Sequence, residues 1–257
     1  MVVNEGVASL EAELHQALSA IRERDERLLS LCHALQTPLA VVLMRSEMLL
    51  AKPSEPGALD HGLHSICGAA RMQAAIIDNV AEHSRMLEGA PDLVPVSVDL
   101  ASCVHDVLSR FEYQAGERRI KTRLHAEAGA WIVNGDPARL TLAIHNLVGN
   151  AVKFTPSGGT VEVSLLRGPA TASVSVADTG SGFSAEEGEH LFDPLPPLPV
   201  EDSDSPHRSR SLRLGLVVVR WIALIHGGTI SARSAGPSRG ATFVLTIPAV
   251  AVEQRDT

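Results

Sequence analysis

Cysteine is scarce in this sequence, and long apolar runs are missing. Only three cysteines occur among 257 residues, Cys32, Cys67 and Cys103, far apart and without CxxC spacing. This pattern excludes a disulfide framework or a cysteine metal cage, and it predicts reduced, mostly buried thiols. No window approaches the roughly 18 uninterrupted apolar residues of a membrane span. The stretch MVVNEGVASLEAELHQ lacks the basic flank and apolar core of a signal peptide, so we expect a soluble, cytoplasmic protein.

Positive charge is in the minority. Lys and Arg number 22 against 30 Asp and Glu, which gives a net charge of −8 and a pI near 5.7. Nucleic acids and anionic lipids both require clustered Lys and Arg, so this balance argues against them as main partners. The 45% of hydrophobic residues indicates a globular chain, and the length suits one large domain or two medium ones.

The first expected helix carries the pattern of a coiled coil or helical bundle. Counted in alternating steps of three and four, all but one position of its stripe are apolar over four heptads. These positions are Val7, Leu10, Leu14, Ala17, Ile21, Arg24, Leu28, Leu31 and Leu35. His33 lies two residues past Leu31 and points away from the stripe, so the sequence predicts an exposed histidine. We assign residues 1–27 to a coiled-coil segment and 28–89 to a helical domain.

A Pro/Gly/Ser turn, KPSEPG, separates this helix from a second one that ends near Leu87 and Gly89. The apolar stripe of the second helix consists of Leu59, Leu63, Ile66, Ala70, Ile77 and Val80. One helical hairpin cannot bury both stripes, so we expect a homodimer in which two hairpins form a four-helix bundle. Residues 90–98 are expected to form an extended linker.

The pattern then changes to a mixture of helices and strands, which predicts an α+β sandwich with one mixed sheet and helices on one face. This domain covers residues 99–250 and precedes a tail at 251–257. Helices are expected over residues 100–115, 136–154 and 214–226, and strands over 120–126, 131–135, 159–167, 172–178, 228–234 and 241–248. A long loop is expected between the strand at 172–178 and the helix at 214–226.

Several separated segments resemble the sensor histidine kinases of two-component systems, in the family's order and spacing. HALQTPL, from His33 to Leu39, resembles their phosphoacceptor box, and DPARLTLAIHNLVGNAVKFTPSGG resembles their N box. DTGSGF resembles their first glycine box, and LFDP their phenylalanine box. LGLVVVRWIALIHGGTISARS and GATFVLTIP resemble the second glycine box and the closing hairpin. The resemblance covers nearly the whole chain from Leu28 to Pro248 and implies a GHKL-type ATP-binding domain.

The N box places Asn146, Asn150 and Lys153 on nearly one face of a helix, because residues four apart are neighbours there. An amide oxygen is a hard ligand that suits Mg²⁺, and a lysine offers a point charge to phosphate. The resemblance implies that Asn150 holds Mg²⁺ while Asn146 and Lys153 assist in ATP binding. An ordinary polar surface on an amphipathic helix is the alternative.

The first glycine box ends a predicted strand at Asp178. A carboxylate there can accept a hydrogen bond from the exocyclic amine of adenine, and Gly180 and Gly182 let the backbone approach the base. A plain strand-to-turn sequence is the alternative. By resemblance, Thr242 in the closing hairpin also belongs to the ATP-binding residues.

The second glycine box departs from the family pattern G-x-G-L-G-L. Here it reads SLRLGL, so Gly215 is the only one of the three glycines present. Glycines in this box expose backbone N–H groups to phosphate at a helix N-terminus, and their loss should impair that cradle. Arg208, Arg210 and Arg213 either supply charge in their place or form a solvated basic run.

The phosphoacceptor box also departs from the family. Imidazole suits phosphoryl acceptance because one nitrogen attacks while the other carries the proton. Pro38 permits a local kink nearby, and Thr37 matches the position that in the family orients a water for dephosphorylating the partner, or else caps the kink. The residue after His33 is usually acidic and accepts the ring proton, whereas here it is Ala34. Loss of a general base typically costs a factor of about 10²–10⁴ in rate.

Two functions follow from the resemblance. In the first, the chain autophosphorylates His33 from Mg·ATP and transfers the phosphoryl group to an aspartate of a response regulator. In the second, a degenerate kinase acts as a non-catalytic scaffold or a histidine phosphotransfer intermediate, as Ala34 and the altered glycine box suggest. No sensory domain is visible before Val7 in this sequence, so we expect the signal to arrive through the N-terminal coil or from a separate sensory protein.

Overall fold

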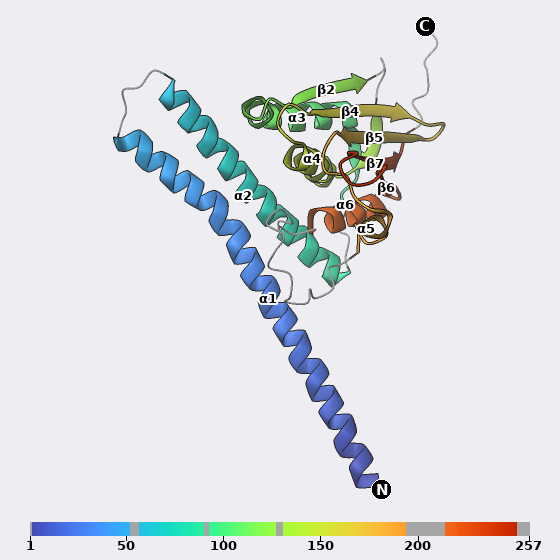
Figure 1. Ribbon diagram of the computed structural model, residues 1–257. Helices are drawn as coiled ribbons and strands as arrows, with labels where there is room; N and C mark the ends of the chain where they lie inside the picture. The colour runs from blue at the N-terminus through green and yellow to red at the C-terminus, as the bar shows by residue number, and fades with distance from the viewer. Residues whose placement is uncertain (1, 52–56, 90–92, 127–130, 194–213, 251–257) are drawn as a thin grey trace. The chain divides into compact units, whose positions relative to one another are not determined.

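This computed structural model describes residues 2–51, 57–89, 93–126, 131–193 and 214–250 (Figure 1). The contacts of the chain group it into two compact units, and the division falls between Gln73 and Ala74, inside a helix. The sequence places the boundary later, in the linker at 90–98. The difference arises because residues 74–88, named here the α2 C-terminal segment, belong to the second unit, where their polar side chains contact residues of later helices.

The first unit is helical. Helix α1 covers Val2–Ala51, and helix α2 covers Ala58–Glu88. The predicted coiled-coil segment and the first bundle helix are therefore one continuous helix. Near the turn, Gly62 of α2 lies so close to Leu49 of α1 that a Cβ atom on it would come within 2.8 Å of the leucine side chain. The predicted helical hairpin is thus present, and a small residue lets its two helices meet.

Helix α1 continues through Pro38 without a break. The hydroxyl of Thr37 donates to the carbonyl of His33 over 3.1 Å, one turn earlier. The ring of Pro38 is buried, whereas His33 and Thr37 are exposed. The predicted exposure of His33 is confirmed, and the expected local kink leaves the helix intact.

The cysteine prediction is wrong in part. All three cysteines are free, as expected, and Cys103 is buried, but Cys32 and Cys67 are exposed. The reason is their place on helices of the first unit, where a single chain leaves much of each helix in solvent. Burial of Cys103 raises the pKa of its thiol.

One segment, Leu31–Ala51, is long and apolar enough to cross a membrane by length and composition, with a mean hydropathy of 1.2. The expectation of no span rested on uninterrupted apolar runs, and this segment is interrupted by Arg45 and Glu47. An arginine at the centre of a membrane helix costs about 2.5–3.5 kcal/mol. A single helix of this kind is weak evidence for a span, and the location of the protein stays a prediction.

The second unit combines helices and strands in the predicted order. Its helices are α3 (Leu100–Glu117), α4 (Pro137–Phe154), α5 (Ala185–Glu189) and α6 (Leu214–Ile225). Its strands are β1 (Val96–Asp99), β2 (Lys121–Ala126), β3 (Ile132–Gly135), β4 (Thr160–Arg167), β5 (Thr171–Asp178), β6 (Thr229–Arg233) and β7 (Ala241–Pro248). The α+β prediction is confirmed.

The strands form two sheets rather than the single sheet expected. The main sheet has the order β2-β4-β5-β7-β6, in which β2 and β4 are parallel and the other neighbours antiparallel. Strands β1 and β3 form a separate antiparallel pair. Strand β1 lies mostly in the segment predicted as a linker. This segment is not fully extended linker, because its last residues form a four-residue strand that pairs with β3.

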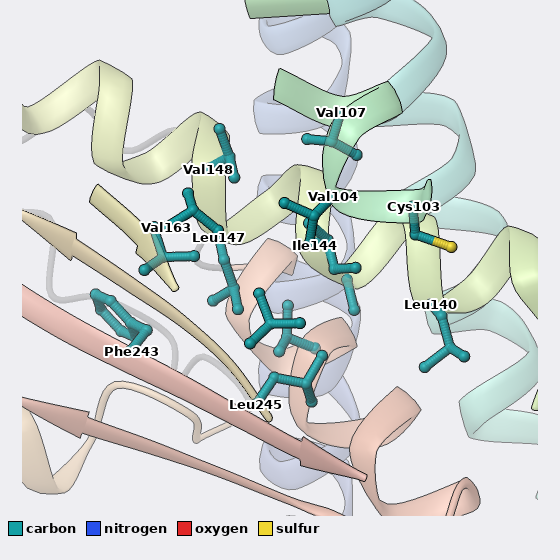
Figure 2. Packing of buried hydrophobic residues seen from close by; sticks show 14 of the residues in the cluster. Cys103, Val104, Val107, Leu140, Ile144, Leu147, Val148, Val163, Phe243 and Leu245 are labelled. Carbon is teal, nitrogen blue, oxygen red and sulfur yellow. The ribbon is translucent and has the colours of Figure 1, made fainter. Parts of the chain in front are cut away.

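The core lies between the main sheet and the helices α3, α4 and α6 (Figure 1). Strand β7 alternates buried and partly exposed residues, so that Phe243 and Leu245 face the helices while Thr242 lies on the opposite face. Figure 2 shows these two side chains against Ile144 and Leu147 of α4. Alternation of period two thus fixes which side of the sheet carries the core.

Helix α5 lies where the sequence predicts only a long loop. Ser184 accepts from the backbone N–H of Glu187, and the Glu187 carboxylate accepts from the backbone N–H of Ser184. This capping box satisfies two backbone donors at a helix start. Its signature, SAEE, is visible in the sequence, but five residues are too few to show a helical period.

His226 connects the end of α6 to the start of α4. Its ring is buried. Its Nε2 accepts from the backbone N–H of Asp136 over 2.9 Å, and its Nδ1 donates to the carbonyl of Ile222 over 2.7 Å. Both bonds require the neutral ring with its proton on Nδ1. Burial lowers the pKa of His226 below its usual value.

This bonding pattern predicts that the free energy of unfolding falls as the pH drops below about 6.5. The unfolded chain then binds a proton that folded His226 does not, so acid favours unfolding by up to about 1.4 kcal/mol per pH unit. The stability is fully present above the unfolded pKa and is lost as the pH falls toward the lowered one. Urea unfolding of the wild type and of His226→Gln over this range measures the slope. Equal slopes would contradict the assignment to His226.

Candidate functional site

Helix α4 carries three of the predicted site residues. Asp136 begins the helix by accepting from the backbone N–H groups of Ala138 and Arg139, which satisfies donors that a helix start leaves unpaired. One face of α4 is buried in the core and consists of Leu140, Ala143, Ile144, Leu147, Val148, Ala151 and Val152. The other face carries Asn146 and Asn150, both half-buried, and the exposed Lys153. The amphipathic pattern of α4 therefore presents the N-box residues together.

Asn146 forms a reciprocal amide pair with Asn79 of α2. The Asn79 Nδ2 donates to the Asn146 Oδ1 over 2.9 Å, and the Asn146 Nδ2 donates to the Asn79 Oδ1 over 2.7 Å. Asn79 is buried. Gly215, at the start of α6, lies so close that a Cβ atom on it would come within 3.0 Å of the Asn146 Oδ1. The amide of Asn146 is thus engaged by the α2 C-terminal segment.

One turn further along α2, the buried carboxylate of Glu82 is surrounded by three donors. Its Oε1 lies 2.9 Å from the Arg139 Nε and accepts from the Trp221 Nε1 over 3.3 Å, while its Oε2 accepts from Arg85 over 2.8 Å. The side chains of Glu82 and Arg139 are 2% and 9% exposed. This network joins α2, α4 and α6 into one polar cluster, named here the Glu82 cluster.

Lys153 lies in the last turn of α4. Its ammonium is 5.0 Å from the centre of the Phe154 ring. Although the side chain is exposed, the atoms around it partly desolvate the ammonium and lower the pKa of Lys153. A lysine at this place presents a positive charge one turn beyond Asn150, as a phosphate site requires.

Asp178 ends β5 and is held in one orientation. Its Oδ1 accepts from the backbone N–H of Gly180 over 2.7 Å and of Ala241 over 3.3 Å. Burial raises the pKa of Asp178, while these two N–H groups act in the opposite direction. Among the described residues, its Oδ2 has no such bond, so this oxygen can accept from a ligand.

A cavity of about 230 Å³ adjoins Asp178. It is lined by Asp178, Arg233, Ser234, Ala235, Arg239, Gly240, Ala241 and Thr242. Thr242 therefore shares a cavity with Asp178, but its position on β7 puts it on the sheet face away from α4. Asn150 and Lys153 do not line this cavity.

Gly180 and Gly182 allow close packing within the chain. Gly182 has a φ of 57°, and a Cβ atom on it would lie 2.4 Å from the carbonyl oxygen of Gly236. A Cβ atom on Gly180 would lie 2.6 Å from the carbonyl oxygen of Phe154. Any side chain at either position would displace backbone, so these glycines hold the loop after β5 against the end of α4 and the β6–β7 turn.

The comparisons with known proteins agree with this arrangement. Residues 135–251 match the family of Histidine kinase-, DNA gyrase B-, and HSP90-like ATPases. The sensor-like histidine kinase SenX3 of Mycolicibacterium smegmatis is 32% identical over 219 residues, which are 84% of this chain and 55% of SenX3. Over most of its length this chain is similar to sensor histidine kinases, and its residues 135–251 carry the ATPase domain of that family.

Solved structures support the family. The mycobacterial sensor histidine kinase MprB is 26% identical with a TM-score of 0.51, over 60% of this chain and 97% of that one. Histidine kinase ThkA, in complex with the response regulator protein TrrA, shares the fold at 20% identity and a TM-score of 0.56. The match covers 92% of this chain and 64% of ThkA. The chain spans about half the length of the curated relatives it matches, such as SenX3.

The structure brings some of the predicted ATP-binding residues together and leaves others outside its described part. Asn146 and Gly215 lie against each other, while Asp178 and Thr242 share a cavity. Two positions of the second box where the family has glycine lie outside the described residues. The three arginines Arg208, Arg210 and Arg213 also lie there. How each residue contacts nucleotide stays a prediction.

Sequence reasoning missed Asn79 and the Glu82 cluster. Both residues lie on α2, whose stripe of apolar residues indicates a bundle helix and nothing more. Asn79 is 67 residues from Asn146, and Glu82 is 139 residues from Trp221. A local sequence pattern cannot reveal contacts between residues that lie so far apart along the chain.

Proposed function

We propose that this chain is an ATP-dependent protein-histidine kinase core that transfers the γ-phosphoryl group of ATP to His33. The phosphoryl group then passes to an aspartate in the receiver domain of a response regulator. The observation that carries the proposal is an exposed histidine in a family phosphoacceptor box on α1, together with an ATPase-type second unit. The ThkA complex with a response regulator supports the choice of partner.

The residues present fit Mg·ATP. Asp178 offers one carboxylate oxygen to the exocyclic amine of adenine, because its other oxygen is held by two backbone N–H groups. The amide oxygen of Asn150 would hold Mg²⁺, which neutralises phosphate charge when bound. Lys153 places an ammonium one turn further along α4 to face phosphate. Asn146 can contribute to ATP binding alongside Asn150 and Lys153 only when its amide is released from the amide of Asn79.

The transfer step requires a neutral imidazole. One ring nitrogen of His33 attacks the γ-phosphorus, the bond from phosphorus to the bridging oxygen breaks, and the electron pair leaves with ADP. The proton on the other ring nitrogen must pass to a base. Ala34 supplies none, so water takes this proton and the step is slow.

The first unit suits a homodimer. Large apolar side chains on α1 and the first part of α2 are exposed in a single chain, among them Leu39, Leu43, Met48, Leu59 and Leu63. Two hairpins that pair through these side chains bury them in a four-helix bundle. We place the protein in the cytoplasm, where receiver domains and ATP are available. We expect its signal to reach it through the N-terminal helix or from a separate protein.

A scaffold without kinase activity is the second candidate. Three observations favour it: Ala34 replaces the usual acid, the second glycine box has lost two glycines, and the amide of Asn146 is occupied. Nucleotide binding can survive when phosphoryl transfer is lost, so the two functions differ in one measurable step.

Incubation with γ-labelled ATP and Mg²⁺ tests the proposal. Wild-type chain is expected to gain acid-labile label, and His33→Gln is expected to gain none, because glutamine has no nucleophilic ring nitrogen. Asn150→Ala should lose the label through weaker Mg·ATP binding. The control is His64→Gln, an exposed histidine on α2, which should keep it. Nucleotide binding without label in the wild type would establish the scaffold, and label on His33→Gln would overturn the assignment of the acceptor.

A further inference from the structure

The end of α4 leaves a row of backbone carbonyls without partners inside the helix, as every helix does. Here these carbonyls belong to the turn that carries Lys153 and follows Asn150 directly. The proposed ATP-binding face therefore depends on whatever holds this last turn in place.

Arg118, the residue after α3, supplies most of these partners. Its Nη1 donates to the carbonyl of Val152 over 2.5 Å and of Lys153 over 3.3 Å, and its Nη2 donates to the carbonyl of Thr155 over 2.7 Å. A planar guanidinium can reach several carbonyls at once, and its charge is favourable at a helix C-terminus.

The carbonyl between those of Lys153 and Thr155 has a different partner. The carbonyl of Phe154 accepts from the backbone N–H of Ser181, which lies in the glycine loop after Asp178. Arg118 thus binds carbonyls on both sides of Phe154 and leaves that one to the loop. The hydroxyl and backbone N–H of buried Thr155 both donate to the carbonyl of Ala151 and close the turn.

The position of Arg118 is itself constrained. Its own carbonyl accepts from the backbone N–H of Gly158 over 3.2 Å, so the chain after α4 returns to the residue that caps it. The ends of α3 and α4 and the turn before β4 therefore meet at Arg118, in a region that the nucleotide-binding assignment does not include.

We propose that Arg118 is a positioning residue for nucleotide binding. Its guanidinium sets the last turn of α4 so that Phe154 engages Ser181, which fixes Asn150 and Lys153 relative to Asp178. Without the guanidinium, the last turn of α4 loses its three hydrogen bonds to Arg118. The distance between the end of α4 and the loop after Asp178, which we expect to bind opposite ends of ATP, is then no longer fixed. The inference rests on the proposed function, because it concerns the same ATP site.

Two substitutions separate the effect of the hydrogen bonds made by the planar Arg118 guanidinium from the effect of its positive charge. Arg118→Ala removes both, while Arg118→Lys keeps the charge but reaches fewer carbonyls. We expect Arg118→Ala to weaken binding of a non-hydrolysable ATP analogue with Mg²⁺ by about tenfold or more, as loss of hydrogen bonds from a charged group does. Arg118→Lys should recover only part of this loss.

Two control variants guard against simpler explanations. Arg119→Ala removes the same charge from the neighbouring exposed residue, so it reports any general attraction of ATP to positive charge. Val133→Ala destabilises the unit from the buried side of β3, so it reports any effect of lower stability. Both should bind the analogue as the wild type does, at a temperature where all variants are folded.

The backbone amide of Ser181 supplies a readout beyond affinity. Its NMR chemical shift is expected to change in both Arg118 variants without nucleotide and to stay unchanged in Arg119→Ala and Val133→Ala. Wild-type affinity in the Arg118 variants, an unchanged Ser181 signal, or an equal loss in Val133→Ala would each overturn the inference while leaving ATP binding intact. A wild type that binds no nucleotide would overturn the proposed function and the inference with it.

Discussion

Replacement of Ala34 by Glu is expected to raise the initial rate of His33 labelling from ATP by about 10²–10⁴-fold. The family resemblance puts an acidic residue here, and that residue takes the ring proton during phosphoryl transfer. Ala34 is half-buried beside the exposed His33 on a continuous helix. A glutamate on this turn can extend along the helix surface toward solvent, so the gain in rate should not require a new fold.

Initial rates of acid-labile labelling with γ-labelled ATP and Mg²⁺ measure this gain. Ala34→Gln is the matched control, because glutamine has nearly the size of glutamate and no basic carboxylate. Only Ala34→Glu should accelerate the reaction. If the two variants label at the same rate, then the missing base does not limit the wild type, and the altered second glycine box becomes the better explanation for slow transfer.

Replacement of Glu82 by Ala is expected to lower the free energy of unfolding of the second unit by about 3–5 kcal/mol. Arg139 would keep its charge in a site where its side chain is 9% exposed, without the carboxylate that balances it. The Trp221 Nε1 would lose its acceptor as well. Removing one partner of a buried ion pair costs far more than the pair itself contributes.

Urea unfolding followed by tryptophan fluorescence measures this loss. Glu88→Ala makes the same chemical change at an exposed position of the same helix and should shift the stability by no more than about 0.5 kcal/mol. A combined Glu82→Leu and Arg139→Met variant should recover much of the loss, because neither charge then remains buried. Equal stability of Glu82→Ala and Glu88→Ala would show that the α2 C-terminal segment is not part of the second unit.

Local patterns predicted most elements of the second unit. The helix expected over 136–154 corresponds to α4 at Pro137–Phe154, because Asp136 and Pro137 mark a helix start and the apolar residues recur with a helical period. The strands β4 and β7 alternate in burial over at least six residues each, which is enough to show period two. Strand β1 was missed because four residues in a proline-containing stretch resemble a linker.

The sequence named individual residues of the candidate site but none of the contacts that connect them. The motif order indicated Asn150, Lys153 and Asp178, and each lies at the end of the element that the sequence assigned to it. The partners of Asn146 and the cap provided by Arg118 were not visible. Hydrogen bonds across 67 and 34 residues depend on how helices pack, which no single motif encodes.

By itself the sequence determined that His33 is displayed on a helix, since helix geometry and the heptad pattern decide which side chains face outward. It also determined the order of the ATP-binding segments. Only the tertiary structure decided that Asn79 occupies the amide of Asn146, that Glu82 is buried against Arg139, and that Arg118 caps α4. The physical reason is that periodicity is a property of one element, whereas a buried polar contact exists only once two elements have packed together.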